Sequence, residues 1–382
     1  MFGDRALWMA LGTMICVMLK IVREFVSQNP GLKARTIASC LGLERSILNQ
    51  LLHANKDTFQ QAQECCWSLI PPKELRIEFG GKAWLDAKDV ERLLRGGGSP
   101  LDSNCGQVLF CLKKDTRIML EALARLLALC NQLSQAGKTV TLDFNEAQGT
   151  LTYLDRLGFF DHLSVPIHVL PKRPVLGRSR KFRGNNDGLI ELRAIDPTQE
   201  DSDIPRLLEQ SFVKFAGDGY SVAIMTILSE LYRNVLEHSA ATTPGFAGLQ
   251  YYKATRHIQA VISDSGQGIV GTLAPVLERR YPKLAKKVTS SKEHAGVVLL
   301  KEVFSVGRIS QVDDEGRGLG LKQSGDFAKK FRARISVRQR DFELRIHQSH
   351  DRATFTHETD LVRIEGTHIC FDFLLDASSE SL

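Results

Sequence analysis

The sequence predicts an α/β protein of the α+β multidomain type, built from three folded blocks. Its 382 residues are more than one hydrophobic core usually supports. Apolar residues recur at helical spacing near the start, strand and helix patterns alternate in the middle, and glycine-rich turns follow apolar runs towards the end. The expected domains are 1–98, 104–168 and 199–378, with a basic linker over 169–198.

Composition places the chain among ordinary globular proteins. Hydrophobic residues make up 43% and charged residues 25%, which excludes collagen-like, low-complexity and wholly disordered classes. The net charge of +6 permits a nucleic-acid or phosphate partner without requiring one. The 8 cysteines form neither a Cys-x-x-Cys pair nor a zinc pattern. We therefore expect a reducing, cytoplasmic location and no disulfide framework.

One apolar run, Ala6 to Val22, could be mistaken for a membrane span. Lys20 interrupts it before the roughly 18–20 residues that a bilayer requires. No small-residue cleavage site follows, which argues against a signal peptide. We expect a buried helix or a helix packed on a partner chain, and therefore no membrane partner. A homodimer formed through this helix is one hypothesis.

The first block, 1–98, has the pattern of a helix-turn-helix. Ala38 is small enough for two helices to cross closely, and Gly42 can adopt the positive φ of a tight turn. The inner faces are formed by apolar residues at helical spacing, namely Ile37, Leu41, Leu43, Leu48 and Leu51. Alternating runs at 66–69 and 75–79 predict the two strands of a wing.

The outer face of the second helix is the candidate contact surface for DNA or a partner protein. Its residues, with one beyond the helix, are Arg45, Ser46, Asn49, Gln50 and Lys56. Arg45 is the single cation of the helix itself, whereas phosphate contacts usually dominate DNA affinity. DNA binding and protein docking are therefore equal alternatives for this block.

The middle block, 104–168, alternates strands and helices. Strands are expected at 107–112 and 139–144, and helices at 117–136 and 149–163. On this pattern alone the block resembles STAS domains, and a packing module without a ligand is the alternative.

Two segments flanking the middle block predict joints. Gly96 to Pro100 has the composition of a flexible joint. The linker 169–198 is rich in cations between Lys172 and Arg183. This strip is expected to be either solvated or in contact with phosphates.

The last block contains four motifs, the first on a helix expected to begin near Ser221. Glu230, Asn234 and His238 follow one another at intervals of four residues and therefore share a helix face. An amide oxygen can bind Mg²⁺, and a carboxylate one turn away can accept a proton from water. This pair suits a magnesium-phosphate site.

The second motif follows an apolar strand that ends at Asp264. A carboxylate at a strand end can accept hydrogen bonds, such as those of an adenine amino group. Gly266 and Gly268 follow, and glycines let the backbone pass close to a flat ring. The fourth motif begins at Thr367, a hydroxyl residue that opens the last expected strand.

The third motif is a run of alternating glycines that leads into a helix. Such a loop presents backbone N–H groups and a helix N-terminus to phosphates. It has neither the sequence of a Walker loop nor the spacing of a dinucleotide-binding fold. Its candidate ligand-binding residues are Gly316, Arg317, Gly318, Leu319, Gly320 and Lys322.

Together and in this order, the four motifs resemble those of the GHKL superfamily, which groups gyrase, chaperone, histidine-kinase, anti-sigma-kinase and mismatch-repair ATPases. The resemblance covers roughly 199–378. It implies a Bergerat-type α/β sandwich, with a mixed sheet covered on one side by helices, that binds ATP and Mg²⁺. It also implies an ATP lid over 270–315.

The resemblance further implies a role for each matching residue. Asn234 would hold Mg²⁺, with Glu230 as general base and His238 beside the nucleotide. Asp264 would bind the adenine amino group, and Thr367 would reach back towards it. Gly266 and Gly268 would shape the base pocket, and the third motif would hold the phosphates.

The leading functional hypothesis is a cytoplasmic Mg-ATP switch that couples nucleotide binding, with slow hydrolysis or phosphoryl transfer, to the N-terminal block. Ser229, not a histidine, precedes Glu230, which disfavours an autophosphorylating two-component kinase, while an orphan histidine kinase stays a further alternative. The chain ends soon after the fourth motif, so the lysine that a following domain gives gyrase-type members is not expected. A non-catalytic ATP-sensing regulator or DNA-binding transcription factor is the alternative.

Overall fold

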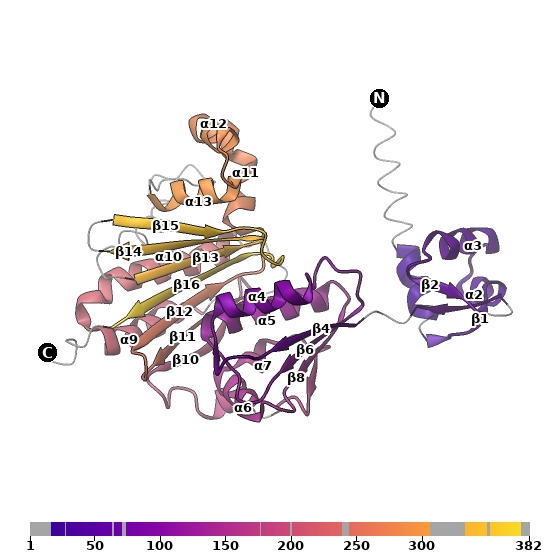
Figure 1. The fold of residues 1–382 in the computed structure, drawn as a ribbon, viewed down its shortest axis with the longest axis horizontal. Coiled ribbons are helices and arrows are strands. Elements are labelled where there is room, and N and C mark those ends of the chain that lie inside the picture. Colours follow the sequence, from indigo (N-terminus) through magenta and orange to yellow (C-terminus); the bar gives the residue numbers. More distant parts are fainter. Residues whose placement is uncertain are drawn as a thin grey trace. The chain divides into compact units, whose positions relative to one another are not determined.

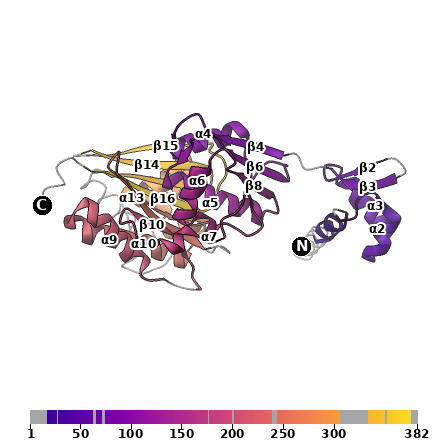
Figure 2. The same cartoon turned by 90° about the horizontal axis from the view of Figure 1, so that it is seen from below.

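The structure is a computed structural model that consists of two compact units, Met1–Lys73 and Glu74–Leu382. The residues that it describes are 17–26, 28–62, 65–70, 74–175, 177–198, 201–238, 244–305, 333–349 and 352–375. Helices combine with both parallel and antiparallel sheets (Figures 1 and 2), which confirms the predicted α+β multidomain class.

The first unit has the element order of a winged helix. A helix over 17–26 precedes β1 (Leu32–Lys33), α2 (Ala34–Leu41), α3 (Arg45–Ala54), β2 (Phe59–Gln61) and β3 (Cys66–Leu69). The strands form an antiparallel sheet in the order β1-β3-β2. Gly42 ends α2 with a φ of 64° and donates its N–H to the Ala38 carbonyl, as the predicted turn requires. The residues buried between these elements include Ile37, Ala38, Leu48, Leu51 and Trp67.

The wing and the first domain boundary differ from prediction. The run 75–79 belongs to β4 (Glu74–Phe79), which pairs with a strand of the second unit because Ile77 and Phe79 are buried in that unit's core. The glycines at 96–98 are not a joint between domains but the end of α4 (Ala87–Gly97). A Cβ at Gly97 would lie 2.7 Å from Ile77 Cγ1, so this glycine permits α4 to approach β4 closely.

The second unit begins with a four-stranded parallel sheet in the order β4-β6-β8-β9. The three further strands are β6 (Gln107–Leu112), β8 (Thr139–Asp143) and β9 (His168–Leu170). Parallel neighbours need crossover connections, and the helices that provide them are α4, α5 (Leu120–Gln135), α6 (Gln148–Leu157) and α7 (Phe159–His162). The predicted alternation is confirmed, except that 117–118 forms β7 and pairs with β5 (Trp84–Leu85). The resemblance to STAS domains stays a prediction.

The predicted linker 169–198 is folded chain. It contains the end of β9, α8 (Arg178–Lys181) and β10 (Leu189–Ile195). Arg173 donates hydrogen bonds to the Phe160 and Ser164 carbonyls at 2.9 and 3.0 Å. Arg178 lies 3.7 Å from the Asp155 carboxylate. These cations of the basic strip hold the segment against α6 and α7, which corrects the interpretation of the whole strip as a solvated or phosphate-contacting linker.

A seven-stranded sheet follows, in the order β10-β11-β12-β16-β13-β14-β15. Its remaining strands are β11 (Gly245–Tyr252), β12 (His257–Ser263), β13 (Ala333–Gln339), β14 (Phe342–Ser349), β15 (Arg352–Glu358) and β16 (Thr367–Leu374). The family resemblance implied a mixed sheet, but every described pair in this sheet is antiparallel. The sheet also begins at β10, before the predicted start of the domain at 199.

Helices cover both faces of the seven-stranded sheet, although the resemblance implied one covered face. On one face lie α9 (Ile204–Ala216), α10 (Ser221–His238), α11 (Gly268–Arg280) and α13 (Ala295–Ser305). A further helix, α12 (Pro282–Ser290), connects α11 to α13. On the other face lies α5, which is apolar on nearly all sides because it packs between this sheet and the parallel one. Its first amide, Leu120 N–H, donates to the Tyr252 hydroxyl on β11 at 2.7 Å.

The sequence run at 6–22 is described only from residue 17. Its described part belongs to the first helix of the winged-helix unit, where Val22 is buried and Ile21 is 49% exposed. No helix in the described parts of the chain has the length and apolar character that a membrane span requires.

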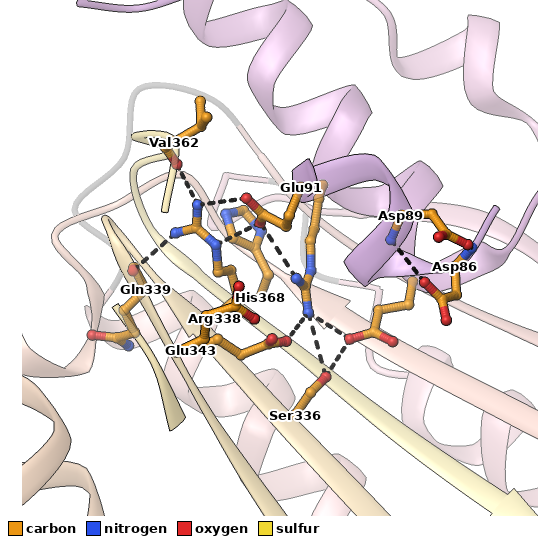
Figure 3. A network of polar contacts seen from close by, with 12 residues as sticks. Asp86, Asp89, Glu91, Ser336, Arg338, Gln339, Glu343, Val362 and His368 are labelled. Atoms are coloured by element: carbon orange, nitrogen blue, oxygen red, sulfur yellow. Dashed lines mark hydrogen bonds and ion pairs between the residues drawn. The ribbon is translucent and has the colours of Figure 1, made fainter. Parts of the chain in front are cut away.

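A buried ionic network joins α4 and α5 to the seven-stranded sheet (Figure 3). The Arg125 guanidinium of α5 lies 2.5 Å from the Glu343 carboxylate of β14 and 3.5 Å from that of Glu91 on α4. Arg338 on β13 donates from Nε to Glu91 at 2.7 Å. Burial lowers the pKa of Arg125, but the surrounding carboxylates outweigh this effect and hold it above its ordinary value. The Arg125 guanidinium therefore stays charged inside the core.

We expect Arg125→Met to lower the free energy of unfolding of the second unit by about 3–5 kcal/mol, because it leaves buried carboxylates without their cation. Urea denaturation measures the change. The matched control is Arg206→Met, since Arg206 belongs to an exposed pair with Asp203 and should cost less than about 1 kcal/mol. Equal losses in both variants would contradict the role of burial.

Candidate functional site

Three neighbouring strands place polar residues at one end of the seven-stranded sheet. Asp264 follows β12, Thr367 begins β16 and Gln339 ends β13, with Thr367 directly opposite Gln339. Side chains alternate along strands, and Ile262 and Val337, two residues away, belong to the core under α10. Asp264, Thr367 and Gln339 therefore face the helix layer that contains α10.

Hydrogen bonds join these residues into one cluster. The Asp264 N–H donates to the Thr367 carbonyl at 2.9 Å, and the Gly266 N–H donates to the Asp264 carboxylate at 2.7 Å. Gln339 donates from Nε2 to the Thr367 hydroxyl at 3.0 Å and accepts from the Val270 N–H at 3.1 Å. The structure thus brings Asp264 and Thr367 together, and adds Gln339, which sequence reasoning missed.

Two glycines allow the backbones at this cluster to approach closely. Gly366 has a φ of 99°, and a Cβ on it would lie 2.0 Å from the Asp264 carbonyl oxygen. Gly268 has a φ of 71°, and its Cβ would lie 3.0 Å from Gln339 Oε1. The sequence predicted that Gly268 lets the backbone pass close to a flat ring. In the structure, Gln339 and Gly366 of the protein itself occupy at least part of the space beside Gly268.

Asp264 is a titratable group in an apolar setting. Asp264 is only 8% exposed. Burial raises its pKa to about 6, while hydrogen bonds from Gly266 and Thr367 act in the opposite direction. Near neutral pH this carboxylate is ionised and needs a donor, because an unpaired buried charge is costly.

The first motif lies on α10, as predicted, and approaches the cluster through Val235. A Cβ on Gly245 would lie 2.6 Å from Val235 Cγ1 and 3.7 Å from the Asp264 Cα, so this turn of α10 lies beside the end of β12. Glu230 and Asn234 are half-buried, and no hydrogen bond joins either side chain to another described residue.

Other predicted residues are not placed at this cluster. His238 is the last residue of α10, and its side chain lies outside the described part of the structure. The phosphate-binding motif also lies outside the described residues, namely Gly316, Arg317, Gly318, Leu319, Gly320 and Lys322.

The predicted lid over 270–315 is mostly helical where it is described. Its last described helix, α13, is part of the core: Val297, Leu299 and Leu300 are buried against the sheet. A Cβ on Gly296 would lie 2.6 Å from the Phe342 ring, so α13 packs directly on β14. The interpretation of this stretch as a mobile lid is therefore wrong for α13.

Gln132 on α5 is a second residue that sequence reasoning missed. Its Nε2 donates to the Ser265 hydroxyl at 3.2 Å and to the Glu365 carbonyl at 2.9 Å, and its Oε1 accepts from the Glu365 N–H at 2.9 Å. The block that contains the parallel sheet therefore contacts both loops of the Asp264 cluster. Two neighbouring amides, Asn131 and Gln132, in a largely apolar helix were the only sequence signal.

The candidate contact surface of the winged helix is largely exposed. Arg45, Ser46, Gln50 and Lys56 are exposed and Asn49 is half-buried. Ile47 of the same helix is an exposed apolar side chain, at 44%. The Ser46 hydroxyl donates to the neighbouring Glu44 carboxylate, so one predicted contact group already has an intramolecular partner.

No cluster of three or more histidine, cysteine or acidic side chains that could hold a metal ion occurs among the described residues. Comparisons of the whole chain with protein-family models, with curated proteins and with solved structures found no match. The site is therefore defined by its own geometry.

We expect Asp264→Asn to stabilise the protein at pH 7. The folded-state pKa of about 6 exceeds the ordinary value of 3.8, so the wild type loses stability as pH rises from 4 to 6 and the deficit persists above 6. The asparagine avoids a cost of up to about 3 kcal/mol and can still accept from Gly266.

Denaturation of both proteins between pH 4 and pH 8 measures this difference. It should be small near pH 4, because the aspartic acid is then neutral in the folded state and only about half ionised in the unfolded state. The exposed Asp341→Asn is the control and should show no such dependence. A wild type that is more stable than Asp264→Asn at pH 7 would contradict the assignment.

Proposed function

We propose that the second unit binds Mg-ATP at the Asp264 cluster and acts as a cytoplasmic ATPase or kinase-like switch of the GHKL type. The observation that carries the proposal is the ionised, buried Asp264 beside Thr367, on the sheet face that also bears Glu230 and Asn234 of α10. Free thiols at the described cysteines support a reducing compartment.

In this proposal, Asp264 accepts a hydrogen bond from the adenine amino group. A buried carboxylate with no charged partner among the described residues gains most from such a donor. The Thr367 hydroxyl already accepts from Gln339, so its own proton is directed towards Asp264 or the base. Base recognition then depends on groups from three adjacent strands.

The residues present fit a magnesium ion that arrives with the nucleotide. Asn234 offers one amide oxygen, and Mg²⁺ in nucleotide sites takes most of its other ligands from phosphates and water. Bound Mg²⁺ would neutralise phosphate charge. Glu230, one helical turn from Asn234, would orient or deprotonate the attacking water or hydroxyl.

Gln132 gives the proposed switch an output. Its amide bonds Ser265 and Glu365, which flank the Asp264 cluster on either side. A change at the base pocket therefore reaches α5 and the parallel sheet directly.

The first unit is proposed as the docking module of the switch. Exposed Ile47, the Glu44 carboxylate and the single helix cation Arg45 favour a protein partner over DNA at α3. A non-catalytic ATP sensor or transcription factor is the competing function, and an orphan histidine kinase is a further one.

ATP binding should depend on Asp264. We expect Asp264→Asn to weaken MgATP affinity at least about tenfold, because the amide lacks the carboxylate's charge and is not a pure acceptor. Calorimetric titration of the full chain measures it, and Thr367→Val should give a smaller loss. Asp341→Asn should bind as the wild type does. Unchanged affinity in Asp264→Asn would sink the proposal.

Turnover should depend on Glu230. We expect Glu230→Ala to keep MgATP affinity but to lower phosphate release, or phosphoryl transfer to an added partner, about 10²–10⁴-fold. Arg233→Ala, an exposed residue of the same helix, is the control. If Glu230→Ala turns over ATP at the wild-type rate, Glu230 is not the general base, and a wild type that binds ATP without turning it over would be a sensor.

A further inference from the structure

The helical hairpin formed by α11 and α12 is strongly basic at its outer end. In residues 278–292 a single carboxylate, Glu278, stands against the cations Arg279, Arg280, Lys283, Lys286, Lys287 and Lys292. The chain as a whole is nearly balanced, with 50 basic and 44 acidic residues. The charge of this hairpin is therefore a local feature that average composition does not explain.

The cations lie on the solvent side because the apolar side of the hairpin is used in packing. Ala285 of α12 is buried, and Leu284 and Val288 pack against the core under the sheet. Arg279, Lys283 and Lys286 are exposed. In Figure 1, α12 lies farther from the sheet than α13, at the outer end of the helix layer.

Most of these cations have no acidic partner in the described part of the chain. Lys287 pairs with Glu302, and Arg280 lies over the Tyr281 ring. Among the described residues, none pairs with Arg279, Lys283, Lys286 or Lys292. Successive turns of α12 place Lys283 and Lys286 about 5 Å apart along the helix axis, a spacing that can follow a phosphate backbone.

The absence of exposed apolar anchors selects among polyanionic partners. The large apolar side chains that are exposed in the described chain include none between 268 and 292. Membrane-surface helices insert an apolar face, and protein interfaces rely on buried aromatic or aliphatic anchors. A nucleic-acid backbone requires only mobile cations at a surface.

We propose that the α11–α12 hairpin binds the phosphate backbone of double-stranded nucleic acid, without reading its sequence. The contact uses Arg279, Lys283 and Lys286, with Lys292 at the margin. It does not require the winged helix, and it does not rest on ATP binding. α11 begins at Gly268, beside the Asp264 cluster, and the proposed contact lies at its opposite end and on α12.

The test is binding of the full chain to a short fluorescent DNA duplex of mixed sequence, measured by anisotropy over a series of KCl concentrations without nucleotide. The variant is Arg279→Gln/Lys283→Gln/Lys286→Gln. We expect its affinity at low salt to fall about tenfold or more and its salt slope to shrink by about 2–3 units, near 0.9 for each lost phosphate contact.

Two matched variants make the test specific. Lys88→Gln/Lys114→Gln/Lys253→Gln removes exposed cations from other surfaces of the same unit and should bind nearly as the wild type does. Arg45→Gln/Lys56→Gln removes cations of the winged helix and should also retain the salt slope. Thermal denaturation of all variants should coincide, since none of these side chains has a buried partner.

Several results would overturn the proposal. One is that the hairpin variant binds the duplex as tightly as the wild type does. Another is that the Lys88/Lys114/Lys253 variant loses as much affinity as the hairpin variant. A third is that only the winged-helix variant loses binding. Binding to phosphatidylserine vesicles, without binding to the duplex, would assign the hairpin to a membrane surface instead. Failure of ATP to bind leaves this measurement unaffected.

Discussion

The packing of α5 between two sheets is the constraint on which the second unit depends. A helix that is apolar on nearly all sides has to be covered on nearly all sides, and here the parallel sheet covers one side and the antiparallel sheet the other. Burying Arg125 on the same helix is tolerable only because Glu343 and Glu91 neutralise it within the core. The middle and last blocks, which look like separate domains in the sequence, therefore form one compact unit.

This arrangement also supports the candidate site. Asp264, Thr367 and Gln339 are positioned by adjacent strands, and Gly366 lets the loop before β16 lie against the end of β12. Behind the sheet, Gln132 bonds the loops on both sides of Asp264. The proposed nucleotide pocket and the parallel block thus share hydrogen bonds, which is a physical route for a switch that rigid, independent domains would lack.

Local patterns predicted many of the elements. The turn at Gly42, the apolar faces of α2 and α3, the strands near 107–112 and 139–144 and the helix that carries Glu230 are confirmed. The errors lie where pairing is non-local. The run 75–79 reads as a wing strand, yet it pairs with β6, because alternation shows that a strand forms and not which partner it joins. The cations of the 172–183 strip were predicted to be solvated or to contact phosphates, yet Arg173 donates to a carbonyl of α7.

The sequence by itself determined the α+β class, the helix-turn-helix of the first unit and the helix that carries Glu230, since these depend on spacing within short segments. Only the tertiary structure decided that the chain divides at Lys73, that the large sheet is antiparallel and covered on both faces, and that Gln339 and Gln132 join the Asp264 cluster. The reason is that long-range pairing and burial between two sheets depend on which surfaces meet, and a glutamine in an apolar helix acquires its role only from the loops that fold against it.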